Sequence, residues 1–328
     1  MEMRFYLLYV GQAVSLPKEK LMNKLTCSIL LLISLIILGC GAGVNQGGTK
    51  GSSKPAQKSG VIAKDETWSG NILIEDDVTV PEGVTLTIQP GAIVGFYTES
   101  KKMIQFTVNG NLYAEGNEQR PIRFTSLTIK HNPGDWAGII FGKTSLNSRL
   151  SFSIIQYHQQ ILVRSDSLRM TNNIITNGSG AGISCDSASP FIEDNEITMN
   201  EIGIKCVGNT SAEISKNLIR ANTYGIVCED GATPKITRNI ISDNRQDGII
   251  NYSASSPTIT SNNITRNGGW AVYNGGRLSE NFIQGNNKAG PNAVERGTEN
   301  TSEQYYGVEE VEQPRSSEVT DAGPHERR

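Results

Sequence analysis

The chain has 328 residues, enough for one large domain or two ordinary ones. Its 30 Lys and Arg against 33 Asp and Glu give a formal net charge of -3, which argues against a nucleic-acid-binding protein that needs a basic surface. With 37% hydrophobic residues and 34 glycines, the composition excludes wholesale disorder and a multi-span membrane protein, and it is typical of a turn-rich β protein.

Residues 1–39 are predicted to form a signal peptide. An apolar run from Leu25 to Leu38 follows Lys24, and it is too short for a membrane span but suits a signal-peptide core. Met22 opens a normal signal sequence and is an alternative start codon, so we leave residues 1–21 out of the fold argument.

The end of this run, Ile37-Leu38-Gly39-Cys40, resembles the lipobox of bacterial lipoproteins, although Ile37 stands where that family more often has Leu. The resemblance implies cleavage before Cys40, acylation of Cys40 by fatty acids such as palmitate, and a membrane-anchored protein of the cell envelope. In a diderm source, Gly41 after the cysteine favours the outer membrane or the cell surface. The alternatives are an uncleaved anchor or an ordinary signal peptide cut elsewhere.

Three further segments follow the signal peptide. Residues 40–62, rich in Gly, Ser, Lys and Gln, are predicted to be a flexible linker after the lipidated cysteine. Residues 63–290 form the folded domain. Residues 291–328 hold nine acidic residues against four arginines, which predicts a mostly disordered acidic tail. Within that tail, residues 305–311 are expected to pair with or cover the last part of the domain, because an open sheet edge invites association.

An internal repeat determines the predicted fold. The phrase apolar-x-x-Asn-x-Ile recurs, and its asparagine returns in steps of 22, 22, 22, 23 and 19 residues. The asparagines are Asn173, Asn195, Asn217, Asn239, Asn262 and Asn281. A second, interleaved phrase of Gly-Ile and two further residues begins at Gly182, Gly203, Gly225 and Gly248. Each repeat therefore holds short alternating segments separated by turns, which predicts strands and no long helix.

A unit this small cannot bury its own apolar face, so it must stack on its neighbours. We predict an all-β, right-handed parallel β-helix of about ten coils of ~22 residues, with three short strands per coil. The isoleucines would fill a narrow core. The asparagines would adopt unusual backbone angles at the turns and bond to one another along the axis.

Three cysteines, Cys185, Cys206 and Cys228, fall at equivalent inward positions of successive repeats. Neighbouring coils bring the Cα atoms of such positions within disulfide range, but the thiols also fit as small apolar side chains. A metal site is disfavoured because collinear thiols do not make a tetrahedron. His131, His158 and His325 are too dispersed for a metal centre, and His158 stands at a turn position that asparagine holds elsewhere. We therefore predict no metal and no cofactor.

Upstream segments extend the resemblance. Residues 80–91, 110–116, 121–126 and 134–141 look like runs common in bacterial β-helix surface proteins of the pectate-lyase-like superfamily. Relatives of that fold include pectate lyases, polygalacturonases, epimerases, carbohydrate-binding and sugar-hydrolase-type domains, and the NosD type involved in metalloprotein maturation. The resemblance implies that a substrate would lie along one outward sheet face, across several coils. It does not fix an activity, because fold does not imply function.

The alternation of the Gly-Ile phrase predicts that outward face. One outward row comprises Ser184, Lys205, Val227, Ile250 and Tyr273. The next comprises Asp186, Val207, Glu229, Tyr252 and Gly275.

Three readings of this face stay open. It could be an ordinary solvated sheet of a non-enzymatic surface or scaffold protein. It could bind polysaccharide, with Tyr252 and Tyr273 stacking on sugar rings. It could belong to a polysaccharide lyase or glycoside hydrolase acting through Asp186, Lys205 and Glu229, with Ca²⁺ needed only by a lyase. The two carboxylates would be two coils apart, about 9.5 Å, at the outer edge of the inverting range. We expect a monomeric, non-enzymatic envelope protein whose partners are the membrane and polysaccharide.

Overall fold

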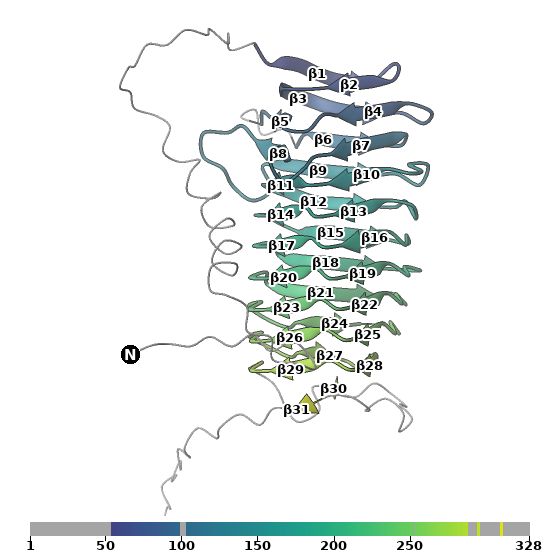
Figure 1. Cartoon of the computed structure of the whole chain (residues 1–328), viewed down its shortest axis with the longest axis vertical. Coiled ribbons are helices and arrows are strands. Elements are labelled where there is room, and N and C mark those ends of the chain that lie inside the picture. The colour runs from purple at the N-terminus through teal and green to yellow at the C-terminus, as the bar shows by residue number, and fades with distance from the viewer. Residues whose placement is uncertain (1–53, 99–102, 253, 288–293, 296–308, 311–328) are drawn as a thin grey trace, which may run out of the picture. The chain divides into compact units, whose positions relative to one another are not determined.

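The computed structural model describes residues 54–98, 103–252 and 254–287, and the backbone of two short strands at 294–295 and 309–310. Every regular element in that part of the chain is a β-strand, and successive turns of the chain stack into a column of parallel coils (Figure 1). The predicted right-handed parallel β-helix of about ten coils is therefore confirmed. Cys40, the signal peptide and most of the acidic tail lie outside the described residues.

Each coil contributes one strand to each of three ladders. Ladder A is a separate ten-stranded sheet. Its strands are β2 (Glu66–Trp68), β4 (Thr85–Ile88), β7 (Asn111–Glu115), β10 (Arg149–Ser151), β13 (Arg169–Thr171), β16 (Phe191–Glu193), β19 (Glu213–Ser215), β22 (Lys235–Thr237), β25 (Thr258–Thr260) and β28 (Arg277–Ser279).

Ladders B and C make up the second sheet. Ladder B comprises β5 (Ile93–Phe96), β8 (Ile122–Ser126), β11 (Ser153–Gln156), β14 (Ile174–Thr176), β17 (Glu196–Thr198), β20 (Leu218–Arg220), β23 (Ile240–Ser242), β26 (Asn263–Thr265), β29 (Phe282–Gln284) and β31 (Glu309–Glu310). Ladder C comprises β6 (Gln105–Val108), β9 (Trp136–Phe141), β12 (His158–Val163), β15 (Ala181–Asp186), β18 (Ile202–Val207), β21 (Tyr224–Glu229), β24 (Ile249–Asn251), β27 (Val272–Tyr273) and β30 (Val294–Glu295).

Two strands mark the ends of this second sheet. The long strand β3 (Asn71–Val80) begins both ladders, since it pairs first with β5 and then with β6. Strand β1 (Ala56–Val61) pairs with β3 and lies within the segment that we predict as linker. At the other end, β31 pairs with β29, as expected for residues 305–311. Within the described residues, no helix is long and apolar enough to cross a membrane.

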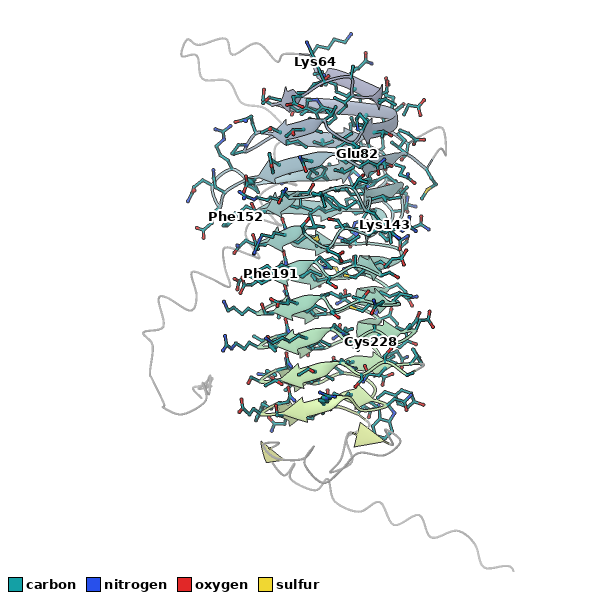
Figure 2. All side chains as sticks on the ribbon, turned by 90° about the vertical axis from the view of Figure 1, so that its right-hand side faces the viewer. Lys64, Glu82, Lys143, Phe152, Phe191 and Cys228 are labelled. Atoms are coloured by element: carbon teal, nitrogen blue, oxygen red, sulfur yellow. The ribbon has the colours of Figure 1, made fainter. Side chains whose placement is uncertain are left out.

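The core consists of columns of inward side chains. In ladder B, Ile197, Ile219 and Ile241 are aligned on successive strands and have no exposed surface. The first coils hold an aromatic core instead, where Phe96 stacks on Trp136 with ring centroids 3.8 Å apart. Figure 2 shows the side chains of successive coils one above another, with Phe152 and Phe191 on the same flank.

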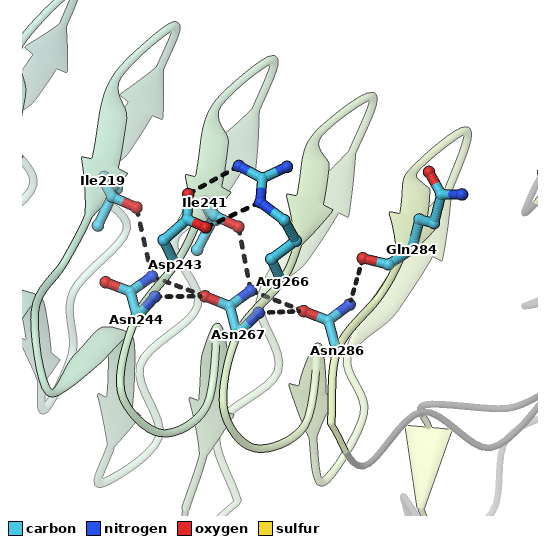
Figure 3. Close-up of polar contacts among 8 residues, drawn as sticks. All are labelled: Ile219, Ile241, Asp243, Asn244, Arg266, Asn267, Gln284 and Asn286. Atoms are coloured by element: carbon cyan, nitrogen blue, oxygen red, sulfur yellow. Dashed lines mark hydrogen bonds and ion pairs between the residues drawn. The ribbon is translucent and has the colours of Figure 1, made fainter. Parts of the chain in front are cut away.

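Two asparagine columns close the turns between ladders. The first column runs from Asn173 to Asn281 between ladders A and B, and the second from Asn200 to Asn286 between ladders B and C. In each column the side-chain Nδ2 donates to Oδ1 of the asparagine one coil further on, and also to a backbone carbonyl one coil back. Asn244 Nδ2, for example, donates to Asn267 Oδ1 at 2.8 Å and to the Ile219 carbonyl at 3.3 Å (Figure 3).

The predicted axial bonding of the asparagines is thus confirmed, but the predicted backbone role is wrong. The column asparagines do not have positive φ; the residue just before each of them does. Those residues include Asp194 (φ 54°), Lys216 (φ 55°) and Arg238 (φ 58°). The left-handed residue makes the corner, and the following asparagine is left with its side chain buried and free to hydrogen-bond along the axis.

The cysteine column lies in ladder C, where Cys185 pairs with Cys206 and Cys206 with Cys228. All three are free thiols with no exposed surface. A hydrogen bond to Cys206, together with burial, holds the pKa values of the Cys185 and Cys228 thiols well above their ordinary value. Protonated, buried thiols of this kind pack as small apolar side chains, which agrees with one of the two possibilities left open by the sequence.

Candidate functional site

The predicted outward rows lie on ladder C in the expected register. Strand pairing aligns Ser184 with Lys205 and Val227 with Ile250, and it aligns Val207 with Glu229. Tyr273 pairs with Ile250 at the end of the first row. Asp186 lies on β15, Glu229 on β21, and Tyr252 directly after β24. The structure therefore brings the candidate residues onto one face that crosses five coils.

Each of the three candidate charged groups of this face is held in an ion pair. Lys205 Nζ lies 2.9 Å from Glu229 Oε2 in the next coil, and Arg164 Nε lies 2.8 Å from Asp186 Oδ2. Strand β18 separates the strands of Asp186 and Glu229, so these carboxylates stand two strands apart, about 9.5 Å. They belong to two separate pairs and do not form one cluster of acids.

Aromatic side chains gather at the far end of the face. Tyr252 is 42% exposed, and its pKa is raised by partial burial and by the nearby Tyr224, Asp247, Tyr273 and Glu229. Tyr252 and these four residues come from three successive coils, on β21, β24 and β27 and the turns beside them.

The sheet beneath this surface is closed to solvent. Val227 and Ile250 point outward in the row of Lys205, yet only 3% and 2% of their surfaces are exposed. Strand pairing places Tyr273 beside Ile250 in the same row, and Tyr252 lies two residues after Ile250. Buried aliphatic side chains and partly exposed tyrosines therefore share this face.

Sequence reasoning missed a third outward row, which consists of Tyr224, Asp247 and Trp270. Backbone hydrogen bonds of 3.0 Å from Gly225 N to Asp247 O and of 2.8 Å from Gly248 N to Trp270 O align these residues on successive coils. The Asp247 carboxylate accepts a short hydrogen bond from the Trp270 backbone N–H, which fixes the start of the last coil. Tyr224 and Asp247 directly precede the repeated Gly-Ile phrase, and Trp270 precedes the equivalent Ala271-Val272, but this position does not show which way their side chains point.

We name the four aromatic side chains the aromatic platform. It consists of Tyr224, Tyr252, Tyr273 and Trp270. All four are partly exposed, and the platform lies on strands β21, β24 and β27 and the turns beside them.

The two described histidines, His131 and His158, are not part of the aromatic platform. His158 is fully buried. It stands at the position that the second asparagine column holds in later coils, as the sequence predicts. His131 stacks on Tyr157 with ring centroids 4.7 Å apart. Among residues 54–98, 103–252 and 254–287, no group of three or more His, Cys, Asp or Glu side chains is arranged to hold a metal ion.

Comparison with known proteins identifies the architecture. The model of the "Right handed beta helix region" family matches residues 110–264 and, in an overlapping alignment, residues 161–304. No curated protein matches the chain.

Several solved structures resemble the chain. The periplasmic alginate epimerase AlgG is 13% identical, with a TM-score of 0.41; the match covers 66% of this chain and 63% of that one. The A-module of the Azotobacter vinelandii mannuronan C-5 epimerase AlgE4 is 14% identical, with a TM-score of 0.36 and coverages of 70% and 68%. The Dettilon tailspike protein is 17% identical, with a TM-score of 0.36 and coverages of 69% and 54%. The chain thus spans less than two thirds of the length of the alginate epimerase, and these likenesses concern the fold alone.

Proposed function

The chain belongs to the right-handed β-helix family, and from that premise we propose that it is a cell-envelope protein that binds polysaccharide on the outward face of ladder C without cleaving it. The observation that carries the proposal is the aromatic platform, which lies exposed on a sheet face whose aliphatic base is buried. Tyrosine and tryptophan offer a large rigid apolar surface with one polar group, which suits a ligand with flat apolar faces and many hydroxyl groups.

The charged groups support binding over catalysis. A general acid must stand free beside the scissile bond, whereas Asp186 and Glu229 each hold a cation within 3 Å. Lys205, which a lyase would need as a base, is the partner of Glu229. These ion pairs occupy the candidate charged groups and leave the aromatic rings as the unpaired part of the face.

The cell-envelope location is part of the same proposal and rests on the lipobox. Acylation of Cys40 would anchor the chain in a membrane, and the segment between Cys40 and the first strand at Ala56 would let the β-helix stand away from the bilayer. Growth of expressing cells with a palmitate analogue should label the full chain. The label should be lost in Cys40→Ala, and labelling that survives this change would contradict the anchor.

The binding proposal predicts a sharp mutational pattern. We would produce the chain without residues 1–40, which leaves every described residue in place, and titrate it with a panel of neutral, acidic and amino-bearing polysaccharides by calorimetry. Tyr252→Ala and Trp270→Ala should each weaken binding about tenfold, because each removes a central aromatic contact. Tyr113→Ala, which removes a tyrosine from ladder A, is the matched control and should leave binding unchanged.

The same samples test catalysis. Incubation of each polymer, with and without Ca²⁺, should release no reducing ends and no unsaturated products. Product formation that is lost in Asp186→Ala or Glu229→Ala would replace binding with a lyase or hydrolase function. A folded protein that neither binds nor cleaves any polymer would leave only the scaffold role.

A further inference from the structure

The ionisable groups around the aromatic platform are unequal in sign. Two carboxylates, Glu229 and Asp247, act on Tyr252, together with the phenols of Tyr224 and Tyr273. Lys205 lies on the same face but is bound to Glu229 at 2.9 Å. Among the described residues of strands β18 to β27, the cation on the outward face is therefore already engaged by a carboxylate.

The other cations near this face are also committed or lie apart from it. Arg164 directly follows β12, three strands before β21 in ladder C, and is paired with Asp186. Arg245 stands in the turn of the second asparagine column, before the outward row of Asp247 begins, and its backbone N–H bonds to the Asn222 carbonyl.

We infer that the aromatic platform selects polysaccharides that lack acidic groups, and that it discriminates against polyuronates; this rests on the proposed polysaccharide-binding function. A polyuronate carries one carboxylate on each sugar, and binding of such anions in proteins relies on Arg or Lys in bidentate or close contact. On this surface its carboxylates would instead meet Asp247 beside a Lys205–Glu229 pair that is neutral overall, and like charges repel.

The raised pKa of Tyr252 agrees with an excess of negative charge around the platform. Partial burial comes first among the causes that raise the pKa of Tyr252, and the neighbouring phenols and carboxylates raise it further. All of these influences disfavour negative charge at the centre of the platform. A sugar carboxylate placed there would meet the same penalty.

The test compares polymers that differ in charge but share a backbone. One pair is hydroxyethylcellulose and carboxymethylcellulose, and the other is fully methyl-esterified and de-esterified homogalacturonan. We expect the neutral member of at least one pair to bind about tenfold more tightly than its acidic partner at low salt, with the difference shrinking as salt screens the repulsion.

Charge variants separate this inference from simple stacking. Asp247→Asn keeps a side-chain oxygen that can accept the Trp270 N–H, and Glu229→Gln frees Lys205, so each should raise the affinity for the acidic polymer several-fold relative to the affinity for its neutral partner. Glu213→Gln, which removes an exposed carboxylate from ladder A, is the matched control and should change neither affinity. Thermal unfolding of each variant checks that the fold is intact.

The outcomes distinguish the two proposals. Equal or tighter binding of the acidic polymers, weakened by Trp270→Ala, would overturn the charge selectivity and leave polysaccharide binding standing. Binding of neutral polymers that Asp247→Asn and Glu229→Gln do not extend to the acidic partner would also overturn the role of these carboxylates. Absence of binding to every neutral, acidic and amino-bearing polymer would remove the proposed function and the selectivity with it.

Discussion

His158 is a buried titratable residue whose chemistry the β-helix holds far from its ordinary state. It takes the coil position of the second asparagine column, has no exposed surface, and lies edge-on to Trp136 with ring centroids 6.2 Å apart. Neither ring nitrogen has a hydrogen-bond partner among the described residues. Burial lowers the pKa of His158 from 6.5 to about 4, because charging the ring would place an uncompensated cation in the core.

The depressed pKa of His158 predicts acid sensitivity. The folded state holds the neutral ring, so its contribution to stability is complete above pH 6.5, falls as the pH drops from 6.5 towards 4, and changes no further below that. Between pH 7 and pH 5 this group alone should lower the free energy of unfolding by about 2 kcal/mol, to be measured by urea titration at each pH.

The control for this prediction comes from the next coil. Gly178 occupies the following position of the second column, and a Cβ there would lie 3.1 Å from His158 Nε2 and 2.6 Å from Asn200 Oδ1. Glycine thus makes room for the histidine ring. A double variant, His158→Asn with Gly178→Asn, would extend the asparagine column by two coils and should lose the pH 7 to 5 effect. An equal loss of stability in this variant would assign the acid sensitivity to other groups.

At the scale of the strand, sequence alternation gave the right rows where the backbone alternates regularly. The inward isoleucines, the inward cysteines and the two outward rows of ladder C all have the predicted register. Because side chains along a strand alternate with period two, knowing which residues are buried determines which residues point outward.

The third outward row could not be read from that alternation. Gly203 and Ile204 both face the core: Ile204 is fully buried, and a Cβ on Gly203 would lie 2.6 Å from Ile219 Cγ2. Two consecutive inward side chains reverse the inward–outward alternation of the residues that precede them in the strand. Tyr224, Asp247 and Trp270 therefore face outward although period-two counting from the isoleucines puts them inward. The missing information was a bend, and only the three-dimensional path of the chain supplies it.

The asparagines show a similar limit at the turns. Their type and spacing predicted the axial hydrogen bonds because an amide can donate and accept in the same direction. The left-handed corner falls one residue earlier, on side chains as different as Asp194, Lys216 and Arg238. Aspartate is among the types that tolerate this conformation, but Lys216 and Arg238 are not, so the stacked geometry of the coils determines the corner more than local preference does.

For the whole molecule, stacking of equivalent coils predicts that one coil can be removed. Deletion of residues 202–223 joins Glu201 to Tyr224, removes β18, β19 and β20, and brings Asn195 into line with Asn239. We expect a cooperative but less stable β-helix that keeps the aromatic platform, because each coil contacts its neighbours only. Circular dichroism and urea unfolding would measure this.

The matched control removes half a coil, residues 202–212. It shifts every later strand to the wrong ladder and places outward side chains in the core, so it should fail to give a cooperative transition. Similar unfolding curves for the two deletions would contradict a modular stack.

The direction of the hydrogen bonds in the three ladders has a mechanical consequence. Strands in each ladder lie across the column, so the bonds between neighbouring coils point along it. A force applied to the two ends of the chain would act on these bonds one coil at a time. The terminal coil would therefore detach first, and the other coils would follow in order. Each step would release the contour of about 22 residues, roughly 75 Å of extended chain. A protein held at one end by a membrane and on its flank by a polymer would then yield in small increments and would not rupture all at once.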